Sequence, residues 1–165
     1  MKEINSYYIK TLLMEYYRFT RQCLCADEVN YLWGRYIADI LLLTKSNFVH
    51  EIEIKTNKSD LCCAELNKKK HINWNKDYPN YFSFAVPISL KQDAEEIISK
   101  LNPKYGLILM DSNYPRMIIN KSAKRIHANQ DKVEVWKNKI IFRNNSALIG
   151  YMKRTHICEE SNENI

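Results

Sequence analysis

The sequence predicts an α/β fold in which a central mixed sheet is flanked by helices. Three observations lead to this class: a helical pattern near the N-terminus, several short strand patterns after it, and further helical patterns between and after those strands. An order in which helices and strands alternate is typical of a sheet covered by helices. The 165 residues suit a single domain. We expect that domain over residues 1–157 and a disordered acidic tail over residues 158–165.

The helices are predicted from the spacing of apolar residues. The first covers residues 5–22, where Asn5 or Ser6 can cap the start. Another covers residues 90–101, between two strand patterns. Less regular helical patterns, the first mixed with loop, lie at residues 59–77 and 132–152.

The strands are predicted from short runs of branched and aromatic residues. These runs lie at residues 23–29, 36–44, 48–56, 81–86, 106–110 and 117–119. The second run is apolar throughout except for Asp39, which predicts a central strand covered on both faces. Lys45, Ser46 and Asn47 form a polar turn, so the second and third runs are expected to pair as a hairpin.

The composition excludes some functions and favours others. The chain has three glycines and no two of them lie close together, which excludes Walker-type and dinucleotide-type glycine-rich phosphate loops. The formal net charge of +6 favours an anionic partner, and nucleic acid is the obvious candidate. A lysine-rich surface with no such partner is the alternative.

The sequence also bears on the cellular compartment. No apolar run approaches the roughly 20 residues that a membrane helix needs, and the N-terminus lacks a signal-peptide core. The five cysteines are an odd number without the spacing of a disulfide scaffold, so we expect reduced thiols. We therefore expect a cytoplasmic protein with no membrane association.

The third strand pattern carries a charged face. Its sequence, V-H-E-I-E-I-K-T over residues 49–56, places Glu51, Glu53 and Lys55 on one side of the sheet. A three-residue turn before it would set Asp39 directly opposite Glu53. Asp39, Glu53 and Lys55 are therefore expected to converge on a partly buried patch, with Glu51 beside them.

Close carboxylates of this kind favour a divalent cation. Mg²⁺ prefers carboxylate and water oxygens and relieves the repulsion between the acids. A metal held by Asp39 and Glu53 could activate water for phosphodiester hydrolysis, while Lys55 offsets developing charge. The alternative is a surface hairpin in which Glu53 and Lys55 form a simple salt bridge.

The string D39…E53-I-K55 resembles the core motif of the PD-(D/E)XK nuclease superfamily. Within it, four ordered segments resemble the small bacterial MmcB-like DNA-repair group: G-R-Y-I-A-D at residues 34–39, E-I-E-I-K-T-N-K-S-D at 51–60, K-K-H-I-N-W at 69–74 and N-Y-F-S-F-A-V-P at 80–87. The resemblance implies a restriction-endonuclease-like αβββαβ core with a C-terminal helical extension. It also implies a Mg²⁺- or Mn²⁺-dependent nuclease that acts on DNA, in DNA repair.

The resemblance also assigns roles to residues. Asp39 and Glu53 would be metal ligands together with the backbone carbonyl of Ile54, and Lys55 would be the catalytic lysine. Some members use an acid from the first helix, for which Glu15 is the candidate here. Glu51 is a further auxiliary candidate, and no small-molecule cofactor is implied.

Basic residues near the charged strand are candidates for contacting the DNA backbone. The group comprises Arg35, Lys58, Lys68, Lys69, Lys70 and His71. A solvated helix face is the alternative for the last four. Two other functions stay open: a catalytically inactive nucleic-acid-binding module of the same fold, and a phage or mobile-element accessory protein. A homodimer is also left open.

Overall fold

The computed structural model describes residues 4–162 except 32–34, 73, 76 and 112–115. Its helices are α1 (Ser6–Glu15), α2 (Lys69–Ile72), α3 (Lys91–Leu101) and α4 (Val133–Asn162), with short π or 3-10 turns η1 (Tyr16–Thr20), η2 (Asp60–Ala64) and η3 (Ile88–Leu90). Its strands are β1 (Leu24–Tyr31), β2 (Tyr36–Leu43), β3 (Val49–Ile54), β4 (Tyr81–Pro87), β5 (Gly106–Asp111) and β6 (Arg116–Lys121).

The described strands form one six-stranded sheet in the order β1-β2-β3-β4-β5-β6. Strands β1, β2 and β3 are antiparallel neighbours, β3, β4 and β5 are parallel, and β6 is antiparallel to β5. The two parallel pairs need crossover connections, which contain η2 and α2 in one case and α3 in the other. The expected mixed sheet flanked by helices is confirmed.

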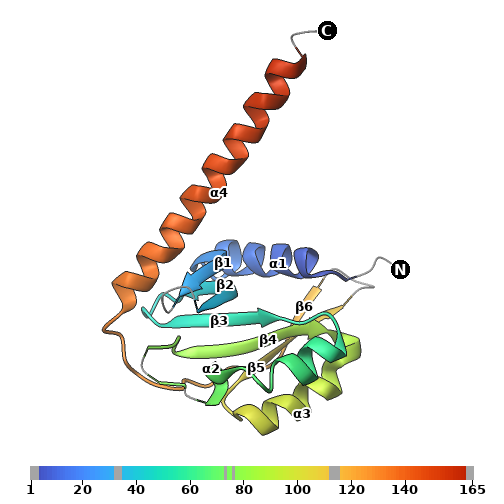
Figure 1. Ribbon diagram of the computed structural model, residues 1–165. Helices are drawn as coiled ribbons and strands as arrows, with labels where there is room; N and C mark the ends of the chain where they lie inside the picture. Colours follow the sequence, from blue (N-terminus) through green and yellow to red (C-terminus); the bar gives the residue numbers. More distant parts are fainter. Residues whose placement is uncertain (1–3, 32–34, 73, 76, 112–115, 163–165) are drawn as a thin grey trace.

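Helix α1 covers one face of the sheet (Figure 1). The Asn5 side chain accepts a hydrogen bond from the Tyr8 backbone N–H and caps the helix start, as the sequence predicted. Ile9 and Leu13 are fully buried and pack against apolar side chains of β2 and β3, including Ile52. The predicted first helix is therefore present, and its last turn, η1, widens to a π-helix.

Two helices cover the opposite face. Helix α3 buries Ala94, Ile97 and Ile98 against β4 and β5. The first turns of α4 bury Trp136 and Ile140 against β1 and β2. The part of this face that lies over β3 is therefore flanked by two apolar clusters, and the charged strand residues lie between them.

The hairpin between β2 and β3 has the predicted register. The Thr44 N–H donates to the Phe48 carbonyl at 2.9 Å, which leaves Lys45, Ser46 and Asn47 as the turn. Asn47 takes the left-handed conformation, with φ 59°, that this tight turn requires. Leu41 pairs with Glu51, as the three-residue turn implies.

The C-terminal segment corrects one expectation. The chain is helical through Asn162, so the disordered tail predicted for residues 158–165 is wrong for residues 158–162, and 163–165 lie outside the described residues. No proline interrupts the segment, and Glu and Arg are good helix formers. Figure 1 shows α4 extending well away from the sheet after its first turns. None of the helices in the described part of the chain combines the length and the hydropathy of a membrane-spanning segment.

Candidate functional site: a buried cluster of carboxylates and lysines

The charged residues of β3, and Lys55 directly after it, are buried in the middle of the sheet. Glu51 is 0% exposed, Glu53 4% and Lys55 5%. In the register, Glu51 lies between Leu41 and Phe82, which belong to the two apolar clusters of the α3 and α4 face. The prediction that Glu51, Glu53 and Lys55 share one face is confirmed, and the alternative of an exposed surface hairpin is wrong.

Asp39 meets this strand where the β2–β3 ladder ends. Backbone pairing stops at Ile40 and Ile52, one position before Asp39 and Glu53. The Ile54 N–H then donates to Oδ2 of Asp39 at 2.7 Å, so a carboxylate replaces the backbone acceptor. Burial, and then the nearby charge of Glu53, raise the pKa of Asp39 above its usual value.

Glu53 is held by three lysines. Its Oε1 accepts from Lys55 at 3.1 Å and from Lys68 at 2.5 Å, and its Oε2 accepts from Lys70 at 2.9 Å. Burial alone would raise the pKa of Glu53. The three ammonium groups outweigh burial and hold that pKa well below its usual range, so Glu53 is ionised at neutral pH.

Glu51 completes the inner part of the cluster. Its Oε1 accepts from Lys70 at 2.8 Å and its Oε2 accepts from the Tyr31 hydroxyl at 2.7 Å. Burial and the Glu51 carboxylate together raise the pKa of Tyr31. Tyr31 is therefore a neutral hydroxyl donor, and Glu51 has a partner at each oxygen.

Glu65 is a member of the cluster that the sequence analysis missed. It is 0% exposed, and its Oε1 lies 2.7 Å from Nε2 of His71. Its Oε2 lies 2.9 Å from Lys68 and 3.3 Å from Lys55, although no hydrogen bond of good geometry reaches that oxygen. The sequence places Glu65 just before a lysine-rich run, but that position alone does not show whether the acid is buried.

Three of the predicted DNA-binding residues, Lys68, Lys70 and His71, belong to this cluster, and two of them are buried in it. Lys70 is 1% exposed and His71 8% exposed, so neither forms the exposed basic face that we expected. His71 is fixed on its other side by the Tyr105 hydroxyl, 2.9 Å from Nδ1. The physical reason is that buried carboxylates on β3 need counter-charges, and the 65–71 segment supplies them.

The other predicted residues are more exposed. Lys69 and Arg35 are exposed, and Lys58 is exposed and pairs with Asp93 at 2.7 Å. Lys68 keeps 31% of its side chain accessible although it reaches Glu53. Glu15 is exposed on α1, which packs on the opposite face of the sheet, so the structure does not bring it to the cluster.

The charges of the cluster do not balance internally. Five carboxylates, from Asp39, Glu51, Glu53, Asp60 and Glu65, surround three ammonium groups, from Lys55, Lys68 and Lys70. When these eight groups are ionised and His71, which lies beside Glu65, is neutral, the excess is two negative charges. That excess, together with hard oxygen donors, fits the chemistry of a divalent cation.

The arrangement is nevertheless not a preformed metal centre. Within the described residues, no group of three or more His, Cys, Asp or Glu side chains is placed to hold a metal ion. Both oxygens of Glu53 accept hydrogen bonds from lysines, so a cation would have to displace one of them. Lys68 is the most accessible of the three.

Comparisons with known proteins identify the fold but no family. No protein-family model matches the chain, and no curated protein matches it. A solved structure, described as a protein of unknown function from Silicibacter pomeroyi, matches with a TM-score of 0.70 and 14% identity, over 94% of this chain and 96% of that chain. At this identity the likeness concerns the fold alone.

Proposed function

We propose that the protein is a metal-dependent phosphodiester hydrolase that acts on DNA, a nuclease of the PD-(D/E)XK type. The observation that carries this proposal is the end of the β2–β3 ladder. There the Asp39 carboxylate binds the Ile54 N–H at 2.7 Å and lies close enough to Glu53 for the two charges to interact, while Lys55 lies 3.1 Å from Glu53. An acid on one strand and an acid–lysine pair on the next are what the predicted chemistry needs.

The order of elements supports the proposal. The chain runs α1, β1, β2, β3, α2 and β4, which is the αβββαβ order that the resemblance implies, and α3, β5, β6 and α4 follow. The three antiparallel strands come first and the parallel β4 is added beside β3. We infer that these elements form a restriction-endonuclease-like core with α4 as its extension.

The proposed site residues have distinct roles. Asp39, Glu53 and the Ile54 carbonyl would hold Mg²⁺ or Mn²⁺, which would supply a Lewis acid and a more acidic water. Burial alone would lower the pKa of Lys55, but Glu53 and Glu65 outweigh burial and raise it. Lys55 is therefore a permanent cation at neutral pH, suited to stabilising negative charge on the phosphate and unable to act as a general base.

The exposed cations suit the phosphate backbone. Lys58, Lys69 and Arg35 are exposed, and the chain as a whole carries +6. Contacts of this kind give affinity that is independent of sequence and weakens steeply with salt. Lys68 has a second role: it is the most accessible of the lysines on Glu53 and therefore the one most easily displaced when a cation binds there.

The decisive experiment replaces Asp39 by Asn. Asn can still accept the hydrogen bond from the Ile54 N–H, and it removes a charge that is already disfavoured by burial, so the fold should persist. Cleavage of supercoiled plasmid DNA in Mg²⁺ or Mn²⁺ should fall about 100-fold or more in Asp39→Asn. Lys100→Met, on the exposed surface of α3, should cut like the wild type. Cleavage that survives Asp39→Asn would remove the mechanism.

A second function is favoured by one observation. Because lysines occupy both oxygens of Glu53, the cluster could be a purely structural ion-pair network in a nucleic-acid-binding module without activity. That function predicts no hydrolysis in either metal, with DNA binding that weakens with salt and does not change in Asp39→Asn. A chain that neither binds nor cuts DNA would contradict both functions.

A further inference from the structure

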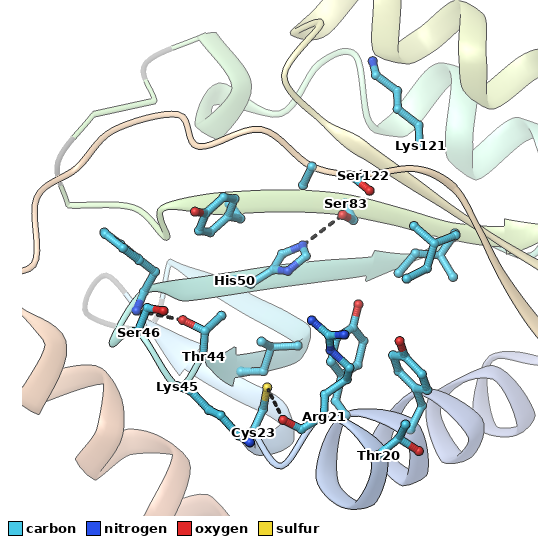
Figure 2. A pocket seen from close by; sticks show the side chains of 18 residues that line it. Thr20, Arg21, Cys23, Thr44, Lys45, Ser46, His50, Ser83, Lys121 and Ser122 are labelled. Atoms are coloured by element: carbon cyan, nitrogen blue, oxygen red, sulfur yellow. Dashed lines mark hydrogen bonds between the residues drawn. The ribbon is translucent and has the colours of Figure 1, made fainter.

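A second site lies on the opposite face of the sheet. A cavity of about 780 Å³ opens between the end of α1 with η1, the β2–β3 turn and the β6 end of the sheet. None of Asp39, Glu53 and Lys55 lines it. Its volume is that of a pocket for a small organic ligand. Figure 2 shows His50 at its centre, with Arg21 reaching up from the end of the helix.

The charge of the lining is entirely positive. Arg21, Lys45 and Lys121 line the cavity, and none of the described residues that line it is acidic. Arg21 follows η1, Lys45 follows β2 and Lys121 is the last residue of β6, and Figure 2 shows the Lys121 side chain pointing away from His50. The ammonium group of the exposed Lys45 donates to Oε1 of Gln22 at 2.7 Å, so Lys45 lies at the rim of the cavity. A cavity with cations and no carboxylates is electrostatically suited to an anion.

The walls are aromatic. The rings of Tyr17, His50, Tyr81 and Phe48 form a continuous series, with successive centroids 6.4, 5.8 and 6.0 Å apart. All four residues line the cavity. Inorganic anions gain nothing from such a surface, whereas a flat heterocyclic ring can stack on it. The walls therefore favour an anion that also carries an aromatic ring.

A polar pair forms the inner wall. Nε2 of His50 lies 2.9 Å from Oγ of Ser83. Burial lowers the pKa of His50 to about 4, so the imidazole is neutral at pH 7 and can both donate and accept hydrogen bonds. Ser83 has little freedom to move, because Gly106 on β5 packs against its hydroxyl so closely that a Cβ there would lie 2.4 Å away. Ser83 is 2% exposed and His50 is half-buried, so the imidazole is the member of this fixed polar pair that a ligand can contact.

We propose that this cavity binds a nucleoside monophosphate, with the phosphate at Arg21 and Lys45 and the base between the aromatic walls near His50 and Ser83. The site is separate from the carboxylate–lysine cluster and does not depend on the proposed hydrolase activity. It is also a small-molecule site that the sequence analysis did not anticipate.

Titration calorimetry on the full chain tests the proposal without metal or DNA. The probes are AMP, GMP, CMP and UMP, with inorganic phosphate and the matching nucleosides as comparisons. At least one nucleotide should bind about tenfold more tightly than phosphate and than its own nucleoside, because only the nucleotide uses both the cations and the walls. Equal affinity for phosphate would mean that the site takes anions in general, and no binding at millimolar concentration would mean that it takes none of them; either result overturns the proposal.

A matched pair of arginine variants locates the site. Arg21→Gln should weaken nucleotide binding about tenfold, because it removes a charged donor from the cavity. Arg18→Gln removes the same charge three residues earlier, from an exposed position that does not line the cavity, and should change the affinity less than about twofold. An equal loss in both variants would show long-range attraction rather than a site. Circular dichroism of both variants confirms that each is folded.

Discussion

At the scale of single residues, Lys70 shows how burial gives a charged side chain its role. Its ammonium group is nearly inaccessible and lies 2.8 Å from Glu51 and 2.9 Å from Glu53, with the ring of Phe82 5.1 Å away. Burial lowers the pKa of a lysine, but the two carboxylates outweigh it and raise that of Lys70. A fully charged lysine is therefore part of the protein interior.

Replacing Lys70 by Met should be costly. The change leaves Glu51 without an ionic partner and removes one from Glu53, both in buried positions. We expect the free energy of unfolding in urea to fall by about 3–5 kcal/mol. Lys100→Met, which breaks an exposed pair with Glu96, should change it by less than about 0.5 kcal/mol. Similar losses in the two variants would show that the buried network adds little.

His50 gives a prediction about pH. Its pKa is about 4 in the folded chain, against an ordinary value of 6.5, because of burial. Between these values the unfolded chain binds a proton that the folded chain does not, so stability should fall as the pH falls from 6.5 towards 4. In His50→Asn, the free energy of unfolding, measured in urea at pH 7, 5.5 and 4.5, should no longer include this dependence on pH. If the variant kept the same dependence on pH, the effect could not be assigned to His50.

At the scale of elements, the β2–β3 hairpin determines which side chains reach the cluster. Its three-residue turn sets the register, and a turn shorter by one residue would move Glu51 and Glu53 to the α1 face. The left-handed Asn47 closes this turn, and its N–H donates to the Thr44 carbonyl at 2.9 Å. The conformation of one turn residue therefore supports the whole site.

Substitutions at Asn47 should differ in stability according to how easily the new residue adopts a positive φ. Asn47→Gly should keep or slightly raise stability, because glycine adopts positive φ without strain. Asn47→Val should lower the free energy of unfolding by about 1–2 kcal/mol, because a branched Cβ clashes in this conformation. Urea denaturation of the two variants measures the difference. Equal stabilities would mean that the turn can change its conformation.

The elements also show what the sequence could and could not predict. The hairpin register and the shared face of Glu51, Glu53 and Lys55 followed from strand alternation and turn length, which are local properties. The burial of Lys70 and the inclusion of Glu65 did not, because they depend on how a crossover segment folds back onto a strand. A lysine-rich run has the same sequence whether it faces solvent or a buried carboxylate.

At the scale of the whole molecule, the protein is a sheet domain with a long helical arm. Trp136 and Ile140 fix the start of α4 to β1 and β2, and Arg143 donates to the Asp27 carbonyl at 3.0 Å. Further along, Leu148 is 57% exposed. The helix therefore has a docked half and a half that extends from the domain, as Figure 1 shows.

Two truncations on α4 test this division. Ile140→Ala should lower the free energy of unfolding by about 2–5 kcal/mol, because it opens a cavity in a packed cluster. Leu148→Ala should change it by less than about 0.5 kcal/mol, because the side chain is largely in water. Thermal and urea unfolding measure both. A large loss in Leu148→Ala would show that the extended half is also packed.

The origin of the three lysines has a consequence for how the chain folds. The first three strands are contiguous in sequence and could collapse together early, yet that meander alone would place two ionised glutamates in apolar surroundings. Lys55, which directly follows β3, can pair with Glu53 at that stage, but Lys68 and Lys70 arrive only when the later crossover docks, and Lys70 is the ionic partner of Glu51. Partly assembled forms are therefore destabilised by buried carboxylates that lack counter-charges, whereas the complete molecule is not. This difference favours all-or-none folding over a populated intermediate.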